Sequence, residues 1–108
     1  MTAPETVLIS GQLVSPGVSP FDRGLQFGDG LFETIACRRG RARFLPWHLQ
    51  RLSLGCERLR IPLPNLSEVR DEVRMLAREV DSAIIKLMLT RGTAVARGYA
   101  PRGCRAPP

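Results

Sequence analysis

The stretch DRGLQFGDGLFET, residues 22–34, decides how the fold is read, because a glycine-rich segment runs directly into a strand pattern. Three glycines within seven residues allow a tight turn and a close approach of the backbone to another group. A phosphate-binding glycine loop would lead into a helix instead, whose N-terminal amides hold the anion. The sequence therefore predicts a structured turn, braced by a pairing of Asp22 with Arg23, and no P-loop or dinucleotide fingerprint.

Strand patterns flank this segment on both sides. Side chains alternate over residues 31–37, which predicts a strand, and Arg39-Gly40 predicts a turn back into a partner at 41–45. Short apolar runs at 7–9 and 13–14 predict an earlier hairpin. The nearly continuous apolar run at 83–89 is typical of a central strand.

Two helices are expected between the hairpin and the last strand. Pro46 opens the first, where its missing N–H costs nothing, and Asn65 with Glu68 forms a capping box for the second. Each has one apolar stripe at helical spacing: Leu45, Leu49, Leu52, Cys56 and Leu59, then Leu66, Val69, Val73, Leu76 and Val80. The fold class is therefore α+β, a small antiparallel or mixed β-sheet with two helices packed on one face.

Composition bounds the function classes. The 108 residues suit one domain, with no apolar stretch near the roughly 20 residues that span a membrane and no signal peptide. Three cysteines without a CxxC pair, and a single histidine, predict neither disulfides nor a metal site. The net charge is +6, but the arginines are spread along the chain with six aromatic residues, which disfavours nucleic-acid binding. A cytoplasmic protein is expected.

Three groups of residues offer chemistry. His48, Arg51 and Gly55 share one helix face, where glycine allows a close approach and arginine can fork onto a phosphate; a packed histidine and a solvated arginine are the alternative. Lys86 is either a Schiff-base nucleophile or a strand lysine whose amine reaches water. The loop at 91–99 carries two arginines and a tyrosine that could bind a carboxylate.

Together, DRGLQFGDGLFET, HLQRL at 48–52 and RGTAVARGY at 91–99 resemble the N-terminal part of the fold-type IV pyridoxal-phosphate enzymes. That family includes branched-chain and D-amino acid aminotransferases and 4-amino-4-deoxychorismate lyase. The resemblance covers about residues 7–100, and RGTAVARGY and HLQRLSLGCERLRI are most similar to the lyase branch.

The resemblance implies a role for each matched residue. Arg51 matches the arginine that binds the phosphate of pyridoxal 5'-phosphate, and Phe27 and Phe32 match positions that line the substrate cavity. Phe32 replaces a carboxylate-binding tyrosine of D-amino acid aminotransferases, which counts against that activity. Arg97 matches a loop that receives a substrate carboxylate, and Arg91 is expected to support this loop.

The family's Schiff-base lysine, and the glutamate that pairs with the pyridine nitrogen, belong to a second domain. Neither position exists in these residues, so the resemblance makes Lys86 structural and assigns no catalytic residue here. It implies a small α+β N-terminal domain at 1–92 and an interdomain loop at 93–108, truncated before the catalytic domain.

The expected function is the N-terminal half of a lyase that eliminates pyruvate from aminodeoxychorismate to give 4-aminobenzoate for folate biosynthesis. Such a piece would be inactive alone and would form a homodimer when full length, with a small-molecule substrate as its partner. Two alternatives stay open: a fragment of a branched-chain or D-amino acid aminotransferase, and a non-catalytic dimerisation or binding module.

Overall fold

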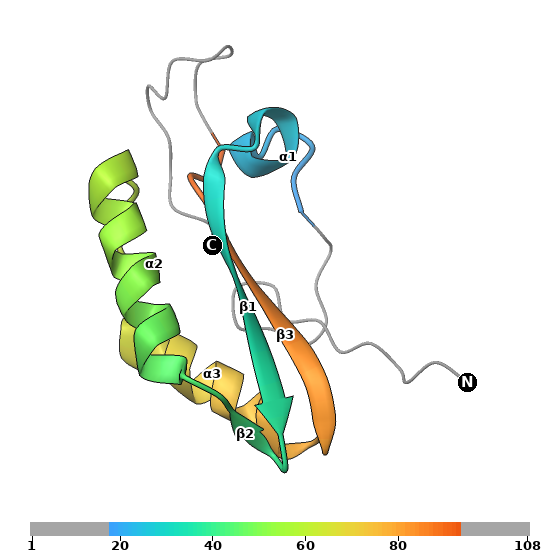
Figure 1. The fold of residues 1–108 in the computed structure, drawn as a ribbon. Coiled ribbons are helices and arrows are strands. Elements are labelled where there is room, and N and C mark those ends of the chain that lie inside the picture. Colours follow the sequence, from blue (N-terminus) through green and yellow to red (C-terminus); the bar gives the residue numbers. More distant parts are fainter. Residues whose placement is uncertain (1–17, 94–108) are drawn as a thin grey trace.

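A three-stranded antiparallel sheet forms the centre of the computed structural model, which describes residues 18–93 (Figure 1). Strand β1 (Gly30–Arg38) lies in the middle, between the short β2 (Arg41–Ala42) and β3 (Ser82–Thr90). The register of β1 and β3 is continuous, from Gly30 opposite Thr90 to Arg38 opposite Ser82. The strand predicted at 31–37 and the turn at Arg39-Gly40 are confirmed.

Helices α2 (Leu45–Leu59) and α3 (Leu66–Arg78) pack on the same face of this sheet (Figure 1). The core joins β1, α2 and α3 through Ile35, Leu45 and Val73, which are at most 5% exposed. Partly buried side chains surround this cluster: Ala42, Leu49, Val69, Ile85 and Leu87. The predicted α+β fold with two helices on one sheet face is confirmed.

The strand predicted at 83–89 is confirmed as β3, but among the described strands it does not lie in the centre of the sheet. Here β3 lies at the edge of the sheet, and its burial alternates along the strand. Ile84 and Met88 are 71% and 65% exposed, whereas Ile85 packs against the core. The apolar run therefore has one face against the helices and one face without cover from any described helix.

The helix ends follow local rules in part. The Asn65 side chain accepts hydrogen bonds from the backbone N–H groups of Ser67 and Glu68, at 3.0 and 3.2 Å, so the Asn65 half of the predicted capping box is confirmed. The strand predicted at 41–45 is too long, because the backbone enters the left-handed region at Phe44 (φ 55°) and α2 begins at Leu45. In the stripe of α2, Leu59 is 42% exposed and does not join the core.

A short helix, α1 (Arg23–Phe27), replaces the turn predicted before β1. Asp22 is its N-cap: the carboxylate accepts from the backbone N–H groups of Gly24 at 2.8 Å and Leu25 at 3.3 Å. Gly28 ends the helix in the left-handed conformation, with φ 64°. The predicted pairing of Asp22 with Arg23 is therefore wrong, because both carboxylate oxygens of Asp22 have other partners.

Two sequence-based predictions lie outside the described residues. The hairpin at 7–14 is one, and the interdomain loop at 93–108 is the other, apart from Thr93. The division into a domain at 1–92 and a following loop stays a prediction. Within 18–93, no helix is long and apolar enough to cross a membrane.

Candidate functional site

A buried carboxylate on β1 organises the candidate site. Glu33 is 6% exposed, and its Oε1 lies 2.7 Å from Nδ1 of His48. Arg51 donates from Nε to both carboxylate oxygens, at 3.1 and 3.0 Å, and from an outer nitrogen to Oε1 at 2.9 Å. The structure thus brings together His48 and Arg51, as their spacing on α2 predicted, and adds Glu33 as their common partner.

The geometry follows from the two periodicities. Positions 48 and 51 lie one turn apart on α2, so their side chains leave the same side of the helix. Glu33 shares its sheet face with Ile35, which is fully buried beneath the helices. The side chain of Glu33 therefore points at α2, where its carboxylate contacts His48 and Arg51.

Gly55 allows this close packing. A Cβ atom at Gly55 would lie 2.9 Å from both methyl carbons of Leu31, so the glycine accommodates a side chain of β1. The expectation that glycine lets another group approach the helix is met, but the described group is Leu31 and not a ligand. The helix can therefore lie against β1 where Glu33 receives Arg51.

The electrostatics keep Glu33 and Arg51 in their charged forms. Burial raises the pKa of Glu33, but the hydrogen bonds from Arg51 and His48 and their charges outweigh it, so the pKa lies below its ordinary value. The same hydrogen bond from Arg51 to Glu33 raises the pKa of the guanidinium. A carboxylate and a guanidinium are therefore held as an ion pair at neutral pH.

Arg51 keeps donors for another group. Its side chain is 72% exposed, although one edge of the guanidinium is bound to Glu33. Guanidinium has five N–H donors in a fixed plane, and Glu33 occupies only the edge formed by Nε and one outer nitrogen. Among residues 18–93 the other outer nitrogen makes no hydrogen bond, so an oriented pair of donors faces outward. This suits a phosphate, which arginine binds through two parallel hydrogen bonds.

A second carboxylate joins the ends of four elements. Oδ2 of Asp29 accepts from Nε of Arg23 at 2.7 Å and from Nε of Arg91 at 2.8 Å. Arg91 also donates to the carbonyl oxygens of Leu59 and Arg60 at the end of α2, at 2.7 and 3.0 Å. This Asp29 cluster connects α1, the beginning of β1, the end of β3 and the end of α2.

The glycine-rich segment serves this junction. A Cβ atom at Gly24 would collide with the Thr90 side chain, and one at Gly30 would lie 2.5 Å from the carbonyl oxygen of Leu89. The backbone N–H of Arg23 donates to the carbonyl of Gly92 at 2.8 Å. The segment 22–34 thus meets Gly92, in the described beginning of the segment 91–99, next to the end of β3.

The remaining candidate residues lie elsewhere. Phe32 is 63% exposed and points to the sheet face opposite Glu33, because neighbouring strand residues alternate. The Lys86 amine lies 5.0 Å from its ring centroid, on the same exposed face. Phe27 lies on α1, with the Arg23 guanidinium 4.8 Å from its ring centroid. Arg97 lies outside the described residues.

Sequence reasoning missed Glu33 and Asp29 as organising residues. Both are single carboxylates in DGLFE, and their partners lie at least 15 residues away on other elements, apart from Arg23. One signal was available, since a glutamate on the same strand face as Ile35 must find a partner when buried. In the described part, no group of histidine, cysteine and carboxylate side chains could hold a metal ion.

Comparisons with known proteins match this architecture. The family model for aminotransferase class IV matches residues 30–105. The aminodeoxychorismate lyase of Vibrio harveyi is 35% identical over 86 residues, which are 80% of this chain and 31% of that protein. The chain thus spans about a third of the length of this curated relative.

Solved structures agree with the sequence match. The crystal structure of 4-amino-4-deoxychorismate lyase from Pseudomonas aeruginosa superposes with a TM-score of 0.76 at 42% identity, over 87% of this chain and 34% of that one. A hypothetical aminotransferase from Mycobacterium tuberculosis, in its PLP-bound form, gives 0.72 at 30% identity, over 80% and 33%. With a family model covering most of its length and these relatives sharing its fold, the chain belongs to the aminotransferase class IV family, the fold-type IV pyridoxal-phosphate enzymes.

Proposed function

We propose that this chain is the N-terminal part of an aminodeoxychorismate lyase, in which Arg51 binds the phosphate of pyridoxal 5'-phosphate. The observation that carries the proposal is the Arg51 guanidinium, bound along one edge to buried Glu33 and presenting its other donors outward. The similarity of the chain to the lyases of V. harveyi and P. aeruginosa supports the choice of reaction.

Glu33 orients the phosphate-binding group. The hydrogen bonds from Nε and an outer nitrogen of Arg51 to the two carboxylate oxygens of Glu33 fix the plane of the guanidinium. Less side-chain freedom is therefore lost when a phosphate binds. His48 also contacts Oε1 of Glu33, through Nδ1 at 2.7 Å. The residues present therefore fit an anionic cofactor group. When bound, pyridoxal phosphate supplies an electron sink for the carbanion formed from the substrate.

The chain provides one wall of the proposed site and not the whole of it. Phe32 and Phe27 would line the substrate cavity, and Arg97 would receive a substrate carboxylate; these roles stay predictions. The Schiff-base lysine would come from the two thirds of the relatives that this chain does not span. We therefore expect no turnover by the 108 residues alone, and a cytoplasmic homodimer when that part is joined.

A chimera tests the reaction directly. This chain would replace the matching N-terminal third of the P. aeruginosa lyase, and folding would be checked by circular dichroism and by the absorbance of bound cofactor. We expect the chimera to form 4-aminobenzoate and pyruvate from aminodeoxychorismate. Arg51→Gln should lose cofactor and activity, whereas Arg58→Gln, an exposed arginine on the same helix, should keep both.

The second candidate is an aminotransferase, favoured by the likeness to the M. tuberculosis protein. The same chimera separates the two reactions. Amino-group transfer from D-alanine to 2-oxoglutarate, without release of 4-aminobenzoate from aminodeoxychorismate, would replace the lyase proposal. A folded chimera that binds cofactor normally in the Arg51→Gln variant would contradict the role of Arg51.

A further inference from the structure

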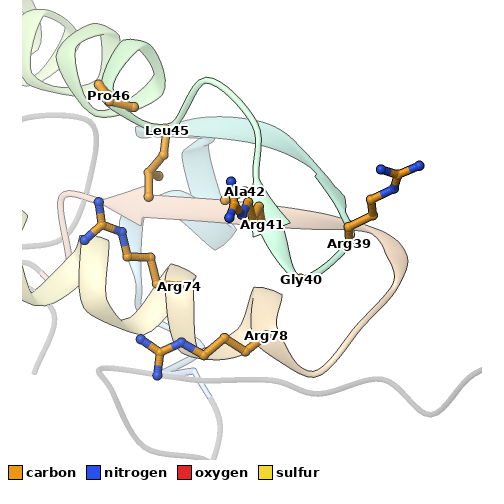
Figure 2. A pocket seen from close by; sticks show the side chains of 8 residues that line it. All are labelled: Arg39, Gly40, Arg41, Ala42, Leu45, Pro46, Arg74 and Arg78. Atoms are coloured by element: carbon orange, nitrogen blue, oxygen red, sulfur yellow. The ribbon is translucent and has the colours of Figure 1, made fainter.

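An open depression lies between the β1–β2 turn and α3, away from the Glu33 cluster. Its volume is about 630 Å³ (Figure 2). The turn and the beginning of α2 form one side, and two arginines of α3 form the other. Its lining residues are Arg39, Gly40, Arg41, Ala42, Leu45, Pro46, Arg74 and Arg78.

The lining is strongly basic. Four of its eight residues are arginines, and none is acidic. Within residues 18–93, none of the four forms an ion pair, in contrast to Arg70, which pairs with neighbouring Asp71. Figure 2 shows Arg74 and Arg78 extending from α3 on the side of the depression, while Arg39 points away. The two guanidinium groups of α3 therefore border this space, and Arg41 lines it from β2.

The scaffold of this depression is fixed by backbone hydrogen bonds. Arg39 donates from its N–H to the carbonyl of Asp81 at 2.7 Å, and Gly40 donates to that of Val80 at 3.0 Å. The turn is thereby tied to the segment that follows α3. The turn, and Arg41 after it, are therefore held beside the end of α3.

Simple structural roles do not account for all three arginines. Arg78 lies in the last turn of α3, where a cation interacts favourably with the helix dipole. Arg74 lies a turn earlier and Arg41 on another element, so neither gains from that dipole. Like charges four residues apart on a helix are mildly destabilising, which makes the pair of Arg74 and Arg78 unfavourable without an anion.

We propose that this depression binds a compact polyphosphate anion. Such an anion carries several negative charges and many acceptor oxygens close together, which suits the guanidinium forks of Arg74 and Arg78. The lining has no aromatic side chain for base stacking, which the binding of single-stranded nucleic acid uses. A small anion therefore fits better than a nucleic acid.

Inorganic tripolyphosphate is the probe, titrated into the 108-residue chain at low ionic strength by calorimetry and by amide NMR shifts. We expect shifts at Gly40 and Ala42, and binding that weakens as salt is added. The double variant R74Q/R78Q should bind about tenfold more weakly or worse, since each lost charge-assisted hydrogen bond is worth that much. Arg58→Gln is the matched control, because it removes one exposed positive charge from α2, outside the lining of the depression.

Circular dichroism and the unfolding midpoint confirm that each variant is folded. Loss of binding in folded R74Q/R78Q, with retention in Arg58→Gln, supports the site. Equal binding by wild type and R74Q/R78Q, equal loss in Arg58→Gln, citrate binding as tightly as tripolyphosphate, or no binding to wild type would each overturn it.

Discussion

Replacing Asp29 by asparagine should destabilise the fold more than any exposed charge change. The variant removes the carboxylate charge that Arg23 and Arg91 share, and the side chains of these arginines are only 5% and 13% exposed. Breaking a buried ion pair by removing one partner costs about 3–5 kcal/mol, and asparagine keeps one acceptor oxygen, so we expect about 3 kcal/mol. For a domain of this size that corresponds to a fall in Tm of roughly 12–24 °C.

The assay is thermal and urea unfolding followed by circular dichroism, with Asp71→Asn as the control. Asp71 also pairs with an arginine, but both side chains are largely exposed, at 67% and 42%. Such surface pairs contribute about 0–1 kcal/mol, so this control should change Tm little. If Asp29→Asn and Asp71→Asn lowered Tm equally, the Asp29 cluster would not be the junction described here.

Three further predictions follow from the same contacts. Gly30→Ala should lower the free energy of unfolding in urea by about 1–3 kcal/mol, because its Cβ would meet the backbone of Leu89. Gly55→Ala should change it by less than about 1 kcal/mol, because the Leu31 methyl groups can turn aside and alanine favours the helix. A larger loss in Gly55→Ala than in Gly30→Ala would contradict the packing described. Ile35→Ala, at a fully buried position that joins both helices to the sheet, should lower the free energy of unfolding by about 2–5 kcal/mol, and a loss below 1 kcal/mol would place the core elsewhere. The free energy of unfolding should fall on acidification, because the pKa values of Asp29 and Glu33 in the folded chain lie below their ordinary values of 3.8 and 4.5. The unfolded chain therefore binds protons first, and the stabilisation present above about pH 4.5 is lost as the pH falls through the folded pKa values. A Glu33→Gln variant whose stability depends on pH in the same way as wild type would argue against this.

The periodic elements could be predicted from the sequence. Alternation over 31–37 gave β1, and the apolar stripes gave α2 and α3, because burial on one side imposes a period that the residues show. Helix α1 was missed because five residues are too few to show a period, although Asp22 before it and Gly28 after it are cap residues.

The errors share a physical cause. The apolar run in β3 indicates that the strand needs cover on its faces, but it does not indicate how many strands lie beside it. The position of β3 among the described strands could therefore not be predicted. Gly55 signals a close approach without naming the approaching group, which proved to be Leu31. Arg51 was identified through the family resemblance, while its partner Glu33 lies 18 residues away, and the sequence carries no direct sign of that pairing.

The claim that Arg51 binds a phosphate group is tested most directly by comparing two ligands that differ only in that group. Pyridoxamine 5'-phosphate and pyridoxamine would be titrated into the cofactor-free chimera and its Arg51→Gln and Arg58→Gln variants, with ligand fluorescence as the signal. We expect wild type and Arg58→Gln to prefer the phosphorylated ligand by about tenfold or more, as one charge-assisted fork would give, and Arg51→Gln to lose most of that preference. An undiminished preference in Arg51→Gln would show that the phosphate is bound by other residues.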